Sequence, residues 1–291
     1  LNNVIIIDLL RIKQWIKNLL VFFPSIAAGT LVNRVVFNDL ITLFFGFSFI
    51  VSSTYIYNDI LDFDSDRKHP TKKNRPLASN SVTLKFSYIT SFICFTLGVL
   101  IISNLDSQIY YLIFLYVLLT VFYSNHGKYI KFLDLSLISI FFILRIILGS
   151  FVSGDRLTTY FLIFIFFMSF GIVTGKKISI KSDKIIENTK VKTFLNLKYT
   201  NKELFLYLKY SFLFSTITFC LWIINENNSI EIVNAAFLVI SIVSLILIQM
   251  RFIELTNFSK TEEIVEVIFS DPKLTIYGIL FGITYVLGVY L

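Results

Sequence analysis

A run of carboxylates follows the second long apolar stretch of the chain. Asp59, Asp62 and Asp66 are spaced three and four residues apart, so on a continuing helix they lie along one face within about 10 Å. Like charges this close repel one another, and a cation between them removes the repulsion. Mg²⁺ is commonly held by carboxylates together with substrate phosphates. The spacing therefore predicts a magnesium site at these residues, with Asn58 as a further ligand; a solvated acidic helix end is the alternative.

Cations follow directly after the carboxylates and are interleaved with them. Arginine and lysine bind phosphate groups, arginine through two parallel hydrogen bonds. A surplus of positive charge in a cytoplasmic loop accounts for part of this segment but not for the interleaving with acids. The pattern predicts a site that holds a metal ion and a polyanion together. The residues concerned are Arg67, Lys68, His69, Lys72, Lys73 and Arg75.

Two more charged residues lie in or beside apolar stretches. Arg145 falls in the middle of one, and Asp134 precedes it by three helical turns on nearly the same face. Charged side chains inside a membrane are costly and are commonly functional, so we expect both in the site; a structural pairing is the alternative. Lys176 and Lys177 end another stretch, where they either bind phosphate or anchor the helix at the interface.

Transmembrane helices must position these residues. The chain has 291 residues, 56% of them hydrophobic and 15% charged, with a mean hydropathy of +0.76. This excludes a soluble domain, a disordered chain and a disulfide-rich module. We predict an all-α integral membrane protein, a single domain over residues 1–291 with about nine spans and cytoplasmic catalytic loops. The stretches are roughly 16–33, 38–57, 83–104, 108–124, 132–152, 158–175, 205–224, 230–250 and 273–291.

The distribution of basic residues predicts the orientation. Nearly all of the 26 Lys and Arg lie in the N-terminal segment or in the loops that share its side of the membrane. The positive-inside rule therefore places the N-terminus and the long loops on the cytoplasmic side of the membrane, which we expect to be a bacterial inner membrane. The net charge of +7 follows from these loops, so we expect no nucleic-acid partner. Cys94 and Cys220 lie in apolar runs and show no metal-binding spacing.

The segment Asn58–Asp66 resembles the NDxxDxxxD signature of the UbiA superfamily of intramembrane prenyltransferases. Within it, the chain resembles the decaprenyl-phosphate phosphoribosyltransferase branch over nearly its whole length. The segments that carry this resemblance are Arg11–Asn18, Asp66–Arg67, His69–Lys72, Arg75–Pro76, Tyr123–Ser124, Lys128, Asp134, Leu144–Arg145, Gly175–Lys177, Tyr199–Thr200, Arg251, Glu262–Glu263 and Asp271.

The resemblance implies transfer of 5-phosphoribose from phosphoribosyl pyrophosphate to a polyprenyl phosphate, with release of pyrophosphate, for cell-envelope polysaccharide synthesis. Mg²⁺ held by Asp59 and Asp62 would take up the leaving diphosphate together with the cations Lys72, Lys73 and Arg75. Lys17, Lys128 and Arg145 would bind the 5-phosphate, and Asp134 would orient the ribose hydroxyls. The predicted substrate-binding residues are Lys17, Asn18, Asn58, Arg67, His69, Lys72, Lys73, Arg75, Tyr123, Ser124, Lys128, Lys176 and Lys177.

Two departures from the family pattern bear on the reaction. Enzymes with aromatic acceptors usually carry a second DxxxD pair, whereas Asp134 has Ile130 and Ile138 at those spacings, which argues against a prenyl diphosphate donor. The family also tends to place a Glu three residues after its basic pair, and this chain has Ile180 there.

Three alternatives and one refinement remain open. Prenyl transfer to an aromatic acceptor is the first alternative, and a lipid or anion transporter is the second, less favoured because the charges cluster at one face. Mn²⁺ can replace Mg²⁺ at oxygen ligands. The excess of Lys over Arg and the abundance of Ile and Asn are typical of an AT-rich genome, which favours undecaprenyl over decaprenyl phosphate as the acceptor. A homo-oligomer is compatible with the sequence.

Overall fold

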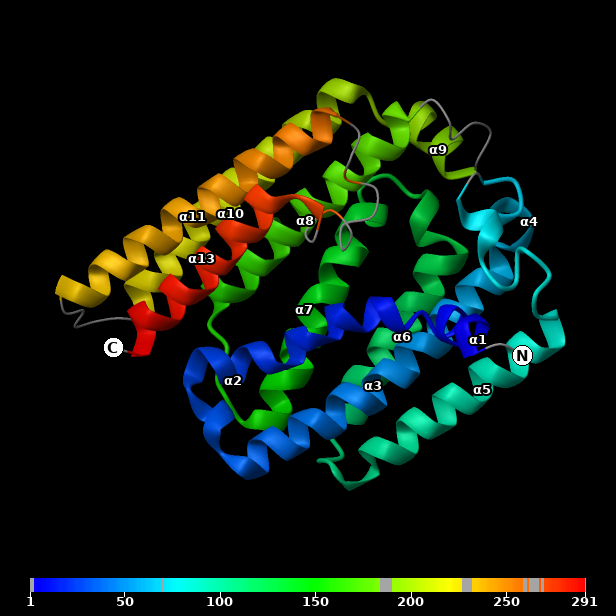
Figure 1. Ribbon diagram of the computed structural model, residues 1–291, viewed down its shortest axis with the longest axis horizontal. Coiled ribbons are helices and arrows are strands. Elements are labelled where there is room, and N and C mark those ends of the chain that lie inside the picture. Colours follow the sequence, from blue (N-terminus) through cyan, green and yellow to red (C-terminus); the bar gives the residue numbers. More distant parts are fainter. Residues whose placement is uncertain are drawn as a thin grey trace. The chain divides into compact units, whose positions relative to one another are not determined.

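The computed structural model describes residues 3–69, 71–183, 190–226, 232–258, 261, 267 and 270–290, and every regular element in those ranges is a helix (Figure 1). The chain divides into two compact units. The first comprises Leu1–Leu137, Leu144–Arg156 and Ile185–Thr193, and the second comprises Ile138–Ile143, Leu157–Lys184 and Phe194–Leu291.

The all-helical membrane architecture predicted from hydropathy is confirmed. Seven helices in the described ranges are long and apolar enough to cross a bilayer, and one shorter apolar helix accompanies them. The seven are α3 (Arg34–Leu61), α5 (Leu84–Ile101, extended by η4, Ile102–Asn104), α7 (Leu133–Ser153), α8 (Thr159–Ser182), α10 (Asn201–Glu226), α11 (Ile232–Asn257) and α13 (Pro272–Tyr290), and the shorter helix is α6 (Ile109–Asn125).

The first predicted span, 16–33, is not a single α-helix, and the expected count of nine is therefore approximate. The short α1 (Asn3–Leu9) is followed by an extended 3₁₀ helix, η1 (Ile12–Phe22), then by α2 (Phe23–Ala28) and η2 (Thr30–Val32). Gly29 ends α2 in a left-handed conformation, with φ of 75°, which glycine adopts without strain.

Helix α3 is the central element of the first unit. It packs against α5 where Gly46 and Gly98 meet, and a Cβ on Gly98 would lie 2.5 Å from the carbonyl oxygen of Gly46, so only glycine allows this approach. The same helix carries η1 along its other side. Asn33 begins α3 by accepting a 2.9 Å hydrogen bond from the backbone N–H of Val35.

In the second unit, α8 packs against α10 and α11 packs against α13. Gly171 allows the first contact, because a Cβ there would lie 2.4 Å from the ring of Phe212. Arg251 joins α11 to the start of α13 by donating two hydrogen bonds to Asp271, at 3.1 and 2.6 Å. The remaining short elements in the described residues are α4 (Phe63–Asp66), η3 (Lys72–Asn74), η5 (Gly127–Tyr129) and α9 (Lys190–Lys198).

Candidate active site

A break between α3 and α4 sets the directions of the three aspartates. Helix α3 ends at Leu61, and Asp62, with φ of −93° and ψ of 5°, joins it to α4. Helical backbone bonds continue on both sides, from Asp62 N–H to Asn58 O at 2.9 Å and from Asp66 N–H to Asp62 O at 2.8 Å. The predicted continuous helix is thus wrong at one residue.

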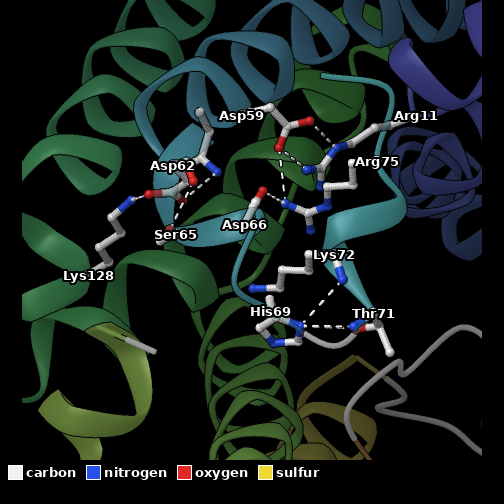
Figure 2. Close-up of polar contacts among 11 residues, drawn as sticks. Arg11, Asp59, Asp62, Ser65, Asp66, His69, Thr71, Lys72, Arg75 and Lys128 are labelled. Carbon is white, nitrogen blue, oxygen red and sulfur yellow. Dashed lines mark hydrogen bonds and ion pairs between the residues drawn. The ribbon is translucent and has the colours of Figure 1, made fainter. Parts of the chain in front are cut away.

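Asp59 and Asp66 share a guanidinium partner (Figure 2). Arg75 Nη1 lies 3.1 Å from Asp59 Oδ1 and 2.5 Å from Asp66 Oδ2, and both carboxylates are buried. Arg11 also donates to both oxygens of Asp59, with Nε at 3.0 Å from Oδ2. Burial raises the pKa of Asp66, an effect that the nearby charges of Arg75 and Lys72 oppose.

Asp62 points to a different partner. It accepts a 2.6 Å hydrogen bond from Lys128 Nζ and a 3.1 Å bond from the side-chain amide of Asn58 (Figure 2). Lys128 is buried in η5. The predicted set of metal ligands is therefore divided into two groups in this structure, Asp59 with Asp66 and Asp62 with Asn58.

The donor chemistry of the first group suits Mg²⁺. In the described ranges no three Asp, Glu, His or Cys side chains converge on one point that could hold a metal ion. A single nitrogen of Arg75 nevertheless contacts oxygens of both Asp59 and Asp66, so one small cation can reach both. Two carboxylates are what Mg²⁺ commonly takes from a protein, with water and substrate phosphate completing its shell.

His69 organises the loop that returns Arg75 to the carboxylates. The ring is buried, and its Nδ1 accepts hydrogen bonds from the backbone N–H groups of Thr71 and Lys72, both at 3.3 Å (Figure 2). An acceptor Nδ1 carries no proton, so these bonds assign the proton of the neutral ring to Nε2. In this structure His69 shapes the loop that leads to Arg75.

One face of η1 contacts two other helices, α3 and α7. A 3₁₀ helix has three residues per turn, so Trp15, Asn18 and Val21 share a face. Trp15 Nε1 donates to Ser52 Oγ at 2.9 Å, and Asn18 Nδ2 donates to Ser48 Oγ at 2.9 Å. Val21 packs so closely on α7 that a Cβ added to Gly149 would lie 1.9 Å from its carbonyl oxygen.

Arg145 of α7 is fully enclosed and belongs to this contact. Its Nε donates to Asn18 Oδ1 at 2.9 Å and its Nη2 donates to Tyr116 OH at 2.8 Å. The guanidinium also lies 5.2 Å from the Tyr116 ring centroid. Two of its donors thus go to uncharged acceptors on η1 and α6.

The other predicted residues differ in how far they are buried. Asp134 and Ser124 are buried, and the Ser124 hydroxyl has no hydrogen-bond partner among the described residues. Some predicted residues are only partly buried or exposed: Lys17, Lys72 and Tyr123 are partly buried, and Arg67 and Lys73 are exposed. Lys176 and the buried Lys177 belong to α8 of the second unit. Pro70, Glu262 and Glu263 lie outside the described residues.

Sequence reasoning missed Arg11, Tyr116 and two serines of α3. The sequence does contain a signal for the two serines, because Ser48, Ser52 and Asp59 are four and seven residues apart and fall on one face of an otherwise apolar helix. A polar stripe inside a membrane span indicates a polar partner, and η1 is that partner.

The fold and the buried cluster define a class of protein, a multi-span helical membrane protein with a buried carboxylate and cation site. Residues 21–264 match the family model of the UbiA prenyltransferase family, and the chain belongs to that family.

Two curated proteins are similar to part of this chain. Decaprenyl-phosphate phosphoribosyltransferase of Corynebacterium glutamicum is 31% identical over 175 residues, which are 59% of this chain and 53% of the relative. The Mycobacterium tuberculosis protein of the same name is 28% identical over 179 residues, 59% and 58% of the two chains. The matches thus span little more than half the length of these curated relatives.

A solved structure shares the fold. It is a UbiA homolog from Archaeoglobus fulgidus bound to DMAPP and Mg²⁺, with a TM-score of 0.65, 15% identity, and coverage of 97% of this chain and 96% of that one. At this identity the likeness extends to the fold alone.

Proposed function

We propose that this protein transfers 5-phosphoribose from phosphoribosyl pyrophosphate to the phosphate of a polyprenyl lipid and releases pyrophosphate. The observation that carries the proposal is the buried group of Asp59 and Asp66 with Arg75 between them, which combines carboxylates for a metal with a cation for a diphosphate. The names of the two relatives support the donor and the reaction.

The chain needs no nucleophile of its own for this reaction. The lipid phosphate is already an anion, and one of its oxygens forms a bond to the anomeric carbon while the bond from that carbon to the pyrophosphate oxygen breaks. Arg75, Lys72 and Lys73 stabilise the leaving diphosphate, because cations placed where negative charge develops lower the barrier. Lys128 donates a hydrogen bond to Asp62, and we assign a second phosphate to this lysine.

Mg²⁺, when bound by Asp59 and Asp66, would neutralise charge on the diphosphate. The roles of Lys17, Asn18, Asn58, Arg67, His69, Tyr123, Ser124, Asp134, Arg145, Lys176 and Lys177 in binding the substrates remain part of the proposal. Asp134 without a DxxxD partner supports a donor other than a prenyl diphosphate.

The proposal places the N-terminus and the site on the cytoplasmic side of a bacterial inner membrane, where nearly all basic residues lie. The lipid tail would remain in the bilayer while its phosphate meets the water-soluble donor at this face. Undecaprenyl phosphate is the proposed acceptor, because the excess of Lys over Arg and the abundance of Ile and Asn are typical of an AT-rich genome.

The test is transfer of label from phosphoribosyl pyrophosphate to undecaprenyl phosphate by the purified protein in detergent. We expect lipid labelling that requires Mg²⁺ and is lost in Asp59→Asn. Labelling of undecaprenyl phosphate should be faster than labelling of decaprenyl phosphate. Consumption of a polyprenyl diphosphate with an aromatic acceptor, with phosphoribosyl pyrophosphate inert, would establish prenyl transfer instead.

A further inference from the structure

Arg11 occupies a position that requires support from its surroundings. Its backbone is left-handed, with φ of 53°, which is strained for a residue with a side chain. The neighbouring chain is fixed by Ser52, whose hydroxyl donates to Leu10 O at 2.7 Å and accepts from Trp15 Nε1. The Arg11 guanidinium lies 5.3 Å from the Tyr55 ring centroid.

Its side chain is placed on the carboxylate that a metal would use. Arg11 donates to both oxygens of Asp59, and Arg75 Nη1 lies 3.1 Å from one of them, Oδ1. A metal ion that binds Asp59 must therefore compete with Arg11 for the same oxygens. A guanidinium displaced from a buried carboxylate needs another anion, because an unpaired charge in such a site is strongly unfavourable.

We propose that Arg11 is a further ligand of the donor diphosphate, held on Asp59 until metal and diphosphate bind together. This rests on the proposed function only in that the donor carries a diphosphate. In this arrangement Arg11 opposes the binding of a metal alone and favours the binding of metal with diphosphate. A purely structural ion pair between Arg11 and Asp59 makes no such distinction.

The test compares Arg11→Gln with Lys13→Gln, a matched charge removal at an exposed residue two positions away. Binding of Mn²⁺ alone is measured by electron paramagnetic resonance. Binding of labelled inorganic pyrophosphate is measured separately at saturating Mg²⁺. We expect Arg11→Gln to bind Mn²⁺ as tightly as wild type or more tightly, and to bind pyrophosphate about tenfold more weakly, the loss expected for one charged hydrogen-bonded contact. Lys13→Gln should change neither.

If Arg11→Gln weakened the binding of Mn²⁺ and of pyrophosphate equally, the inference would be overturned, since Arg11 would then only maintain the structure of the site. Arg11→Lys provides a second variant that keeps the charge. Its single ammonium cannot form the paired contact, so it should retain wild-type Mn²⁺ affinity and bind pyrophosphate several-fold more weakly. Lack of pyrophosphate binding by the wild-type protein would instead contradict the proposed function, and the two failures are thus distinguishable.

Discussion

The guanidinium of Arg145 and the side-chain amide of Asn18, 127 residues apart in the chain, are joined by a 2.9 Å hydrogen bond at a fully buried point of the first unit. Asn18 passes the contact on to Ser48 of α3. The two hydrogen bonds of Asn18 therefore connect α7 to η1 and η1 to α3.

Because Asn18 serves both neighbours, its removal and the removal of Arg145 should not be additive. We expect Asn18→Ala and Arg145→Met each to lower the free energy of unfolding by about 1–3 kcal/mol. The double variant should lose at least about 1 kcal/mol less than the sum of the two. Unfolding in mixed detergent micelles, followed by fluorescence, measures the three values. Additivity to within about 0.5 kcal/mol would mean that the contact carries no coupling.

At Gly149 the backbone of η1 lies directly against α7. Gly149→Ala places a methyl group 1.9 Å from Val21 O, so η1 must shift, and we expect a loss of about 2 kcal/mol or more in stability. Gly278→Ala is the matched control, because a Cβ there meets nothing within 4 Å. A Gly149→Ala protein as stable as the control would show that η1 packs farther from α7 than described.

Arg75 bridges two carboxylates that face one another across it. Arg75→Gln removes the positive charge that Asp59 and Asp66 share, and we expect kcat/KM for the diphosphate donor to fall by about tenfold or more. Lys85→Gln, an exposed change at the start of α5, should stay within about twofold of wild type. The labelled-lipid assay measures the rates of both variants, and an unchanged rate in Arg75→Gln would show that Arg75 does not bind the donor.

His69 is expected to act through the shape of its loop. His69→Ala removes the acceptor of two backbone N–H groups and should lower the transfer rate, because Arg75 is then less well placed. His69→Asn keeps an acceptor oxygen near the same place and should recover part of the rate. A His69→Asn protein as slow as His69→Ala would favour a direct contact between the imidazole and a substrate.

Asp271 gives a pH dependence of stability in the second unit. Its hydrogen bonds from Arg251 hold the pKa of Asp271 below its ordinary value. A carboxyl group with a lowered pKa contributes stability that is present above its unfolded pKa and is lost as the pH falls through the folded pKa. We expect Asp271→Asn to flatten the acid side of a plot of the free energy of unfolding against pH. The change should be about 1 kcal/mol or less, because Asp271 is near the surface.

Hydropathy predicted most of the fold because a long apolar run in a chain of this composition has one stable solution, a helix with its backbone bonds satisfied internally. The predicted spans 108–124 and 132–152 agree with α6 and α7 to within a residue at each end. The segment 16–33 differed because hydropathy reports burial and not helix type.

The candidate site was only partly predictable for a related reason. The seven-residue spacing of Asp59 and Asp66 predicted that they lie close together, and the run of cations that follows them included Arg75. The contacts of Asp59 with Arg11 and of Asn18 with Arg145 join residues 48 and 127 positions apart, and no local pattern encodes such distances. The placement of Asp62 depended on a one-residue break that its neighbours in sequence do not announce.

The 3₁₀ form of η1 also changes how far a short stretch of chain can reach. Arg11 meets Asp59 at one end of the contact with α3, and Phe22 meets Phe44 at the other, with ring centroids 5.9 Å apart. From Phe44 to Asp59, α3 rises about 22 Å at 1.5 Å per residue, and from Arg11 to Phe22 the more extended helix rises the same distance at about 2.0 Å per residue. The two helices of this antiparallel pair stay in register although the η1 segment is four residues shorter. An insertion or deletion of one residue in η1 would turn its later side chains by about a third of a turn, and any relative that keeps these contacts must therefore vary in length outside this segment.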